Sequence, residues 1–355
     1  MRILIINPFG IGDVLFSLPL LHALKEALPQ SVLGYLSNRR TEEMVSAFPH
    51  LDVRLVFEKD EFRAAWRQSK REGALHLYRL VRSVQKQRFD VTLDLSLGWQ
   101  TGLASRLAGI PERIGFDYRG RGRFLTHRIP IMGFHDRPVW KYDLDLLPLL
   151  GIPRPEKIRF ELQIPPAAND QVKSALRTLG VAEGDRLVGL VPGGGFSWGP
   201  SAVFKQWPPE RFADVGDQIS TRYGAKVVLF GDAGEDALCR AVAEKMRSRP
   251  MVATHIPSLL ILAGLLKRCQ LLIGNDSGPL HLAACVGTKT ISIFGPVDSS
   301  VYGPVLRLPT HRVVVKGLAC RPCYRSFRFP PCPWENACLR QLPASSVLEV
   351  AGELM

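Results

Sequence analysis

The sequence of 355 residues lacks any apolar run that approaches the roughly 20 residues needed to span a bilayer. Its start, MRILIINPFG, also lacks the charged opening, apolar core and small-residue cleavage site of a signal peptide, and it has the pattern of a buried strand. These absences argue against a membrane-spanning or exported protein. We therefore expect a soluble, cytoplasmic protein.

Common nucleotide- and nucleic-acid-binding signatures are absent as well. The chain contains neither the GxxxxGK[ST] spacing of a P-loop nor the GxGxxG spacing of a dinucleotide-binding turn. A nicotinamide-dependent dehydrogenase therefore gains little support. Nothing resembles a zinc finger, an RNA-recognition motif or a helix-turn-helix, so no nucleic-acid partner is expected.

Acidic residues are scarce relative to basic ones. The chain has 46 Lys and Arg against 33 Asp and Glu, a formal net charge of +13. The excess gathers in the first half, at 63–88 and at 113–128. Each cluster is compatible with a solvated helix face or a basic loop. Two such clusters in one half instead favour an anionic partner, either an acidic membrane surface or a phosphorylated acceptor.

The order of apolar and polar segments predicts two α/β domains. Strands alternating with helices indicate a doubly wound parallel sheet, and the pattern begins again after the proline-rich stretch at 151–166. We expect an N-terminal domain at 1–165, a C-terminal domain at 166–318 and a cysteine-containing tail with a C-terminal helix at 319–355. Two Rossmann-like domains facing a cleft would bind ligands beyond the carboxyl ends of their strands.

The most informative stretch is 271–296, LLIGNDSGPLHLAACVGTKTISIFGP. It predicts a strand, a polar turn, a helix and a second strand. Ser277 suits the N-cap, and Pro279 suits the first helical turn, where its missing N–H costs nothing. The start of this helix should attract a phosphate. The carboxylate of Asp276 in the turn indicates a ligand that also carries hydroxyls.

Three further turns follow predicted strands. Gly10 to Asp13 comes after the first strand, and Asp13 is either a helix-capping residue or a general base. Gly193, Gly194 and Gly195 offer backbone N–H groups, and Lys205 a positive charge, to a phosphate; alone, they also fit a flexible loop and a surface lysine. Glu235 could accept hydrogen bonds from a ribose, although acidic residues are common at helix starts.

The cysteines form two groups. Cys239, Cys269 and Cys285 lie in helix or strand patterns and are expected to be buried and inert. The other four share a short segment of the tail: Cys320, Cys323, Cys332 and Cys338. Their spacing is compatible with a structural zinc, with free thiols or with disulfides, and a cytoplasmic location disfavours disulfides.

Several of these motifs together resemble glycosyltransferase family 9, the ADP-heptose:lipopolysaccharide heptosyltransferases. The resemblance is carried most specifically by LIGNDSGPLHLAACVGT at 272–288 and FGPVDSSVYGP at 294–304. It extends to ILIINPFGIGDVLFSLPLLHALKEALP at 3–29, RIGFDYRGRGRFLTHRI at 113–129 and KQWPPERFA at 205–213. The basic region at 58–88 matches the family poorly.

The resemblance implies a GT-B fold and an inverting transfer of heptose from ADP-heptose to the lipopolysaccharide inner core that requires no metal. It implies that Asp13 is the base and that Lys205 stabilises the leaving diphosphate. Donor binding would fall to one set of residues: Gly193, Gly194, Lys205, Glu235, Asp276, Ser277, Gly278, Pro279 and His281. Acceptor binding would fall to a second set: Gly12, Arg119, Arg121 and Arg123.

Two alternatives keep the same fold. One is a glycosyltransferase with another nucleotide-sugar donor or a protein acceptor, and the other is a non-catalytic nucleotide-sugar-binding protein. The presence of both Asp13 and Lys205 argues against the second. An acceptor attached to a lipid would place the enzyme peripherally on the cytoplasmic face of the inner membrane. The basic region at 58–88 would then contact the phosphorylated core or the anionic membrane surface.

Overall fold

A computed structural model of the protein describes residues 1–304 and 308–355. The chain folds into two compact units, Met1–Phe160 and Glu161–Met355. The observed division lies within the proline-rich stretch, a few residues before the predicted boundary. The predicted separate tail at 319–355 is part of the second unit, because the C-terminal helix α15 (Ala344–Leu354) packs against helix α9 (Pro209–Tyr223).

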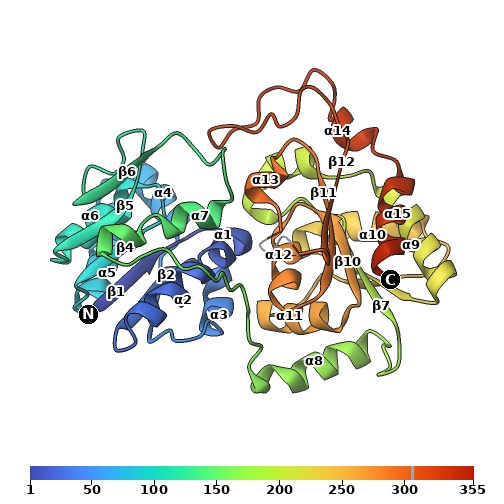
Figure 1. The fold of residues 1–355 in the computed structure, drawn as a ribbon, viewed down its shortest axis with the longest axis horizontal. Helices are drawn as coiled ribbons and strands as arrows, with labels where there is room; N and C mark the ends of the chain where they lie inside the picture. Colours follow the sequence, from blue (N-terminus) through green and yellow to red (C-terminus); the bar gives the residue numbers. More distant parts are fainter. Residues whose placement is uncertain (305–307) are drawn as a thin grey trace. The chain divides into compact units, whose positions relative to one another are not determined.

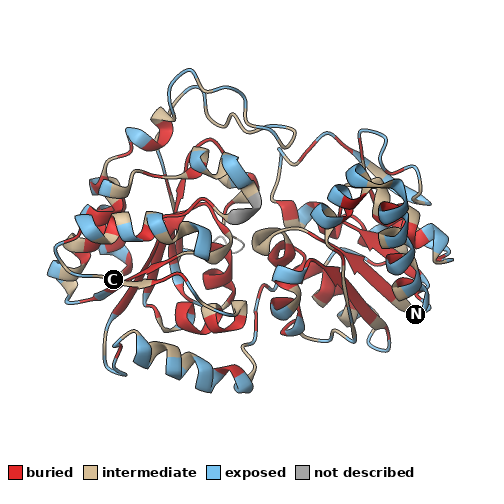
Figure 2. Ribbon diagram, turned by 180° about the vertical axis from the view of Figure 1, so that it is seen from behind, coloured by how far each residue is buried: buried red, intermediate tan, exposed pale blue. Residues whose placement is uncertain are grey.

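The first unit is built on a six-stranded, wholly parallel sheet (Figure 1). Its order is β3-β2-β1-β4-β5-β6. The strands are β1 (Arg2–Ile6), β2 (Val32–Ser37), β3 (Val53–Val56), β4 (Val91–Asp94), β5 (Glu112–Tyr118) and β6 (His127–Ile131). The central strands are almost entirely buried (Figure 2), as expected for a parallel sheet with helices on both faces.

Helices cover this sheet at the positions that the apolar pattern predicts, with two differences. They are α1 (Ile11–Phe16), α2 (Leu18–Ala27), α3 (Arg39–Ser46), α4 (Lys59–Gln68), α5 (Lys70–Gln85), α6 (Trp99–Leu107), α7 (Val139–Leu144) and the 3-10 helix η1 (Leu147–Leu150). The apolar pattern predicts one helix that follows the turn at Gly10–Asp13 and ends at Leu28, but the structure breaks it at Ser17, whose hydroxyl donates a hydrogen bond to the Val14 carbonyl (2.7 Å). Pro19 then starts α2. The helical spacing of apolar residues from Trp66 to Val84 predicts a long amphipathic region, which the structure divides at Ser69 into α4 and α5.

The second unit repeats the same design. Its parallel sheet has the order β12-β11-β10-β7-β8-β9. The strands are β7 (Leu187–Val191), β8 (Lys226–Phe230), β9 (Met251–Ala253), β10 (Leu271–Asn275), β11 (Lys289–Phe294) and β12 (His311–Val315). Because both sheets place later strands on each side of their first strand, each has a point at which the strand order reverses. This point lies between β1 and β4 in the first unit and between β7 and β10 in the second.

The helices of the second unit confirm the predicted alternation. Besides α9 and α15 they are α8 (Pro166–Thr178), α10 (Asp236–Lys245), α11 (Leu259–Arg268), α12 (Gly278–Cys285), α13 (Ser299–Tyr302) and α14 (Ala337–Arg340), with the 3-10 helices η2 (Phe196–Lys205) and η3 (Ala233–Glu235). In the described part of the chain, no helix combines the length and the apolar character needed to cross a membrane.

Candidate functional site

Asn275 joins three segments at the point where the second sheet reverses its order. Its side chain is fully buried at the end of β10. The amide nitrogen donates hydrogen bonds to the carbonyls of Pro192 (2.7 Å) and Gly193 (3.2 Å), and Oδ1 accepts one from the Trp207 N–H (3.0 Å). Asn275 therefore holds two segments at the end of β10: the turn that contains Gly193, Gly194 and Gly195, which we call the glycine turn, and the segment after Lys205. No sequence motif singles out Asn275, although an asparagine at the end of a buried strand is a usable signal.

The turn after β7 is tightly packed at Gly193 and Gly194. A Cβ atom at Gly193 would overlap with the Glu235 carboxylate, and one at Gly194 would overlap with the Ala202 carbonyl. The Gly195 N–H donates a hydrogen bond to Glu235 Oε1 (3.2 Å). The expectation that the turn exposes all its N–H groups is therefore wrong for Gly195, because a carboxylate of the same unit binds it.

Glu235 serves the local structure as well as the turn. Its Oε2 accepts a hydrogen bond from the Asp232 N–H (3.3 Å) in a capping box at the start of η3. Burial, followed by the negative charge of Asp232, raises the pKa of the Glu235 carboxyl, whereas hydrogen bonds from backbone N–H groups lower it. Glu235 thus positions the glycine turn, and its predicted contact with a donor stays a prediction.

A buried ion pair lies beside this turn. Lys205, at the end of η2, places Nζ 2.9 Å from Asp276 Oδ2, and both side chains are less than a tenth exposed. The ammonium also lies 4.3 Å from the centre of the Trp198 ring. Burying two charges costs several kcal/mol per ion unless they are well paired. The structure therefore brings together two residues that the sequence predicted for the donor site from motifs about 70 residues apart.

His281 completes the cluster from the first turns of α12. Its Nε2 is 3.9 Å from Asp276 Oδ1, and its side chain is buried. Burial lowers the pKa of His281 from 6.5 to about 4; the Asp276 carboxylate raises it and the Lys205 ammonium lowers it. The imidazole is consequently neutral at physiological pH, where it can donate one hydrogen bond and accept another.

This buried histidine predicts a dependence of stability on pH. Since the pKa falls from 6.5 in the unfolded chain to about 4 in the folded one, the unfolded chain binds more protons between these values. As the pH falls from 7 to 4.5, the free energy of unfolding of wild type should therefore decrease by about 2 kcal/mol more than that of His281→Gln. Denaturant unfolding of both proteins at the two pH values measures this difference, and parallel losses would contradict it.

The start of α12 points toward the same cluster. Ser277 is the N-cap residue, as predicted, and Pro279 lies in the first turn. The Ser277 side chain, however, makes no capping hydrogen bond, and its buried Oγ has no hydrogen-bond partner in the described residues. A buried hydroxyl without a partner costs free energy. Its position at the positive end of α12 fits a hydrogen bond to a bound anion, together with Gly278.

In the first unit, Asp13 lies in the first turn of α1, directly after the turn that follows β1. Gly12 precedes it, and the Asn7 amide donates to the Asp13 carbonyl (3.0 Å). Asp143 of α7 is buried close enough for the charge of Asp13 to act on it. Burial, followed by the charges of Asp13 and Asp145, raises the pKa of Asp143 well above its usual value. The region around Asp13 thus contains a second, buried carboxyl.

Two more titratable residues lie at the carboxyl edge of the first sheet. Asp94 ends β4 and accepts hydrogen bonds from the Thr101 hydroxyl (2.7 Å) and the Ser96 N–H (2.9 Å), while burial raises its pKa. Lys59 lies 4.8 Å from the centre of the Phe9 ring. Burial and then the charge of Arg63 lower the pKa of Lys59 to about 8. Neither Asp94 nor Lys59 was singled out from the sequence.

The three arginines predicted for the acceptor lie together in the loop after β5. Arg119, Arg121 and Arg123 are all exposed. Their guanidinium groups lie over aromatic rings, with Arg119 5.0 Å and Arg121 5.5 Å from the centre of Tyr118. Stacking on a ring leaves the guanidinium N–H groups available to an anion.

Comparisons with known proteins agree with this geometry. The sequence model of glycosyltransferase family 9 (heptosyltransferase) matches residues 77–328, more than half of the chain. The chain belongs to this family. It is therefore a glycosyltransferase.

The relatives cover most of the chain at low identity. Lipopolysaccharide heptosyltransferase 3 of Escherichia coli is 25% identical over 303 residues, which cover 82% of this chain and 83% of the relative. The solved E. coli ADP-heptose lps heptosyltransferase II is 20% identical, with a TM-score of 0.77, and covers 100% of this chain and 98% of its own. A solved family 9 glycosyltransferase of Veillonella parvula is 23% identical, with a TM-score of 0.81. The match covers 99% of this chain and 96% of the Veillonella chain. These structures confirm the predicted GT-B fold class.

The cysteines of this family 9 enzyme follow the predicted grouping. Cys239, Cys269 and Cys285 are buried, and burial raises the pKa of each thiol, to about 12 for Cys239 and Cys269. The four tail cysteines are also free thiols and line one cavity of about 20 Å³, beside Phe204 and Trp334. In the described part of the chain, no group of three or more Cys, His, Asp or Glu is placed to hold a metal ion. The structural zinc therefore gains no support from the geometry and stays a prediction.

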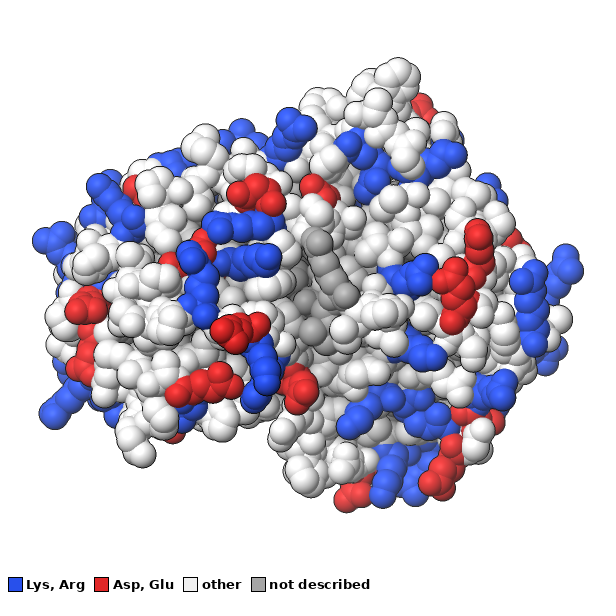
Figure 3. Space-filling model, viewed as in Figure 1, with Lys and Arg blue, Asp and Glu red and all other residues white. Residues whose placement is uncertain are grey.

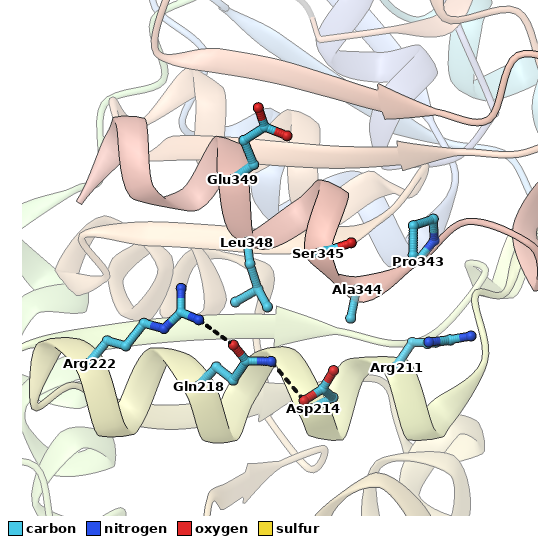
Figure 4. Close-up of a pocket in the computed structure, with 9 residues that line it drawn as sticks. All are labelled: Arg211, Asp214, Gln218, Arg222, Pro343, Ala344, Ser345, Leu348 and Glu349. Carbon is cyan, nitrogen blue, oxygen red and sulfur yellow. Dashed lines mark hydrogen bonds between the residues drawn. The ribbon is translucent and has the colours of Figure 1, made fainter.

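A larger open groove of about 540 Å³ lies elsewhere on the second unit, between α9 and α15 (Figure 4). Along α9, Arg222 donates a hydrogen bond to Gln218 (2.7 Å), which donates one to Asp214 (2.9 Å). The groove carries both signs of charge, and none of the predicted site residues lines it. The cluster around Asp276 is the better candidate for an anionic ligand.

Proposed function

We propose that the protein transfers heptose from ADP-heptose to the inner core of lipopolysaccharide, with inversion and without a catalytic metal. The observation that carries the proposal is the buried Lys205–Asp276 pair beside the start of α12, where Ser277 has an unused hydroxyl. The strand order reverses at this point, which is where ligands bind in such sheets. The E. coli relatives named above, which act on ADP-heptose and lipopolysaccharide by their descriptions, support the choice of substrates.

On the donor side, Lys205 and the N-terminal end of α12 bind the diphosphate. The leaving group gains negative charge as its bond to the sugar breaks, so a fixed cation and an oriented helix dipole stabilise the transition state. Asp276 then accepts hydrogen bonds from sugar hydroxyls, and the Ser277 hydroxyl and the neutral His281 line the diphosphate. The same charges serve the free enzyme, in which Asp276 neutralises Lys205 until the donor arrives.

On the acceptor side, Asp13 is the general base. Its carboxylate takes the proton of the attacking hydroxyl while the acceptor oxygen forms a bond to the anomeric carbon and ADP departs with the bonding electron pair. Direct displacement inverts the anomeric configuration. The exposed guanidinium groups of Arg119, Arg121 and Arg123 bind the phosphorylated acceptor, and Gly12 gives it access to Asp13. On this proposal the enzyme works on the cytoplasmic face of the inner membrane, where a lipid-linked acceptor is within reach.

Thermal unfolding in the presence of nucleotides tests the donor assignment. ADP should raise the melting temperature of the protein, because a ligand at about 100 times its Kd stabilises the folded state by about 2.7 kcal/mol. ADP-heptose should raise it further at equal concentration, since the sugar adds contacts to Asp276. Adenosine, which lacks the phosphates, is the matched control and should give a small shift. A shift with UDP or GDP but none with ADP would overturn the choice of donor.

A further inference from the structure

One face of α5 carries positive charge and apolar side chains that the fold does not use. Because an α-helix turns about 100° per residue, its members fall within one stripe along the helix. They are Arg71, Leu75, Tyr78, Arg79, Arg82 and, directly after the helix, Lys86. All six are exposed, and Leu75 and Tyr78 are 44% and 59% exposed. We call these six residues the α5 stripe.

The opposite face of α5 accounts for its place in the fold. Leu80 and Val84 are buried in the core of the first unit, where they pack with Phe62 of α4. The helix lies so close to α4 that a Cβ atom at Gly73 would overlap with the Trp66 ring. The helix is therefore held by its inner face. Leu75 and Tyr78 of the α5 stripe lie outside this core cluster, so the composition of the stripe needs another explanation.

The charges of the stripe are not neutralised within the protein. Residues 59–88 contain nine Lys and Arg and three Asp and Glu, a net charge of +6 (9 − 3). Among the residues that the structure describes, none of the four cations of the stripe forms an ion pair. Figure 3 shows both basic and acidic side chains on one face of the protein. The stripe thus combines unpaired positive charge with two exposed apolar groups.

This combination selects a particular kind of partner. A polyanion such as RNA would use the cations and could stack a base on Tyr78, but it gains nothing from Leu75. The surface of an anionic bilayer uses both, because lipid phosphates attract the cations while apolar and aromatic side chains enter the interface. Tyrosine is favoured there, since its ring is apolar and its hydroxyl stays hydrated.

We propose that the α5 stripe docks the enzyme on an anionic phospholipid surface, with Leu75 and Tyr78 inserted among the headgroups. The helix lies parallel to the bilayer plane, and the cations on either side of the two apolar residues bind lipid phosphates. The reason for such docking rests on the proposed function, in which the acceptor is lipid-linked. The docking itself does not depend on the identity of the donor.

Sedimentation of the purified full-length protein with vesicles tests the proposal. The vesicles contain phosphatidylcholine alone or phosphatidylcholine mixed with phosphatidylglycerol. Wild type should bind the mixed vesicles and lose binding as NaCl increases. The double variant Arg79→Glu/Arg82→Glu should bind them about tenfold more weakly or worse. Leu75→Ser/Tyr78→Ser, which leaves the charge unchanged, should also bind more weakly. The matched control, Lys173→Glu/Arg177→Glu on the exposed face of α8, should bind like wild type.

The outcomes separate docking from catalysis. Binding of Arg79→Glu/Arg82→Glu that equals wild type would overturn the proposal. The proposal would also be overturned, in favour of a polyanion site, if Leu75→Ser/Tyr78→Ser bound vesicles like wild type and RNA fully displaced wild type from the vesicles. The ADP-induced melting shift should be the same in all variants, because the donor residues belong to the second unit. If ADP gives no shift but the stripe variants lose vesicle binding, the proposed donor fails and the docking surface stands.

Discussion

Replacing Asp13 with asparagine should abolish most of the heptosyl transfer while leaving the fold and donor binding intact. A general base typically contributes a factor of about 10² to 10⁴ in rate, and an amide cannot take up the proton of the attacking hydroxyl. Asparagine keeps the size of the side chain, and the Asp13 carbonyl that accepts from Asn7 is unchanged. The rate should be measured as ADP released from ADP-heptose in the presence of acceptor, and donor binding as the melting shift.

The first turn of α4 supplies the matched control for this variant. Asp60, like Asp13, is an acidic residue in the first turn of a helix of the first unit, but its side chain is 90% exposed. Asp60→Asn should therefore retain wild-type turnover. Loss of the melting shift in Asp13→Asn would show a structural effect, whereas wild-type turnover in that variant would exclude Asp13 as the base.

The fold was predictable because its signals are local. Buried strands such as β1 and β10 appear as short apolar runs, and each is followed by a glycine-containing turn and a helix. Helical connections between parallel strands are almost always right-handed. The alternation of strands and helices alone therefore limits the topology to a few choices. The two breaks that were missed, at Ser17 and Ser69, depend on local turns that apolar periodicity does not encode.

The site was predictable only in part, because its decisive contacts are distant in sequence. Strand-turn-helix patterns predicted Asp276, Ser277 and Lys205 as candidates, and the structure pairs Lys205 with Asp276. The bonds of Asn275, which join residues 68 to 83 positions apart, could not be read from any local pattern. The same holds for the contact of Glu235 with Gly195, which joins the ends of two strands, and for the burial of Asp143, which arises where α7 packs against α1 and α2.

The pairing of Lys205 with Asp276 gives the second large prediction, since either residue alone would be a buried charge. Lys205→Met and Asp276→Asn should both lower the free energy of unfolding, by about 3–5 kcal/mol where a charge is left buried and unpaired. They should differ in donor binding. Lys205→Met should weaken ADP binding at least tenfold, because it removes roughly one charge-assisted hydrogen bond to the diphosphate. It should leave adenosine binding unchanged.

Asp276→Asn should leave ADP binding as tight as in wild type or tighter, because it removes a negative charge from beside the diphosphate. It should instead reduce the preference for ADP-heptose over ADP, since it takes away the acceptor of the sugar hydroxyls. Calorimetric titration of both ligands, below the melting temperature of each variant, measures these differences. Lys226→Met removes a partly exposed lysine paired with Asp185 at 2.7 Å and is the control for loss of a lysine. If both variants of the buried pair weaken ADP binding equally, the pair holds the fold together and does not bind the diphosphate.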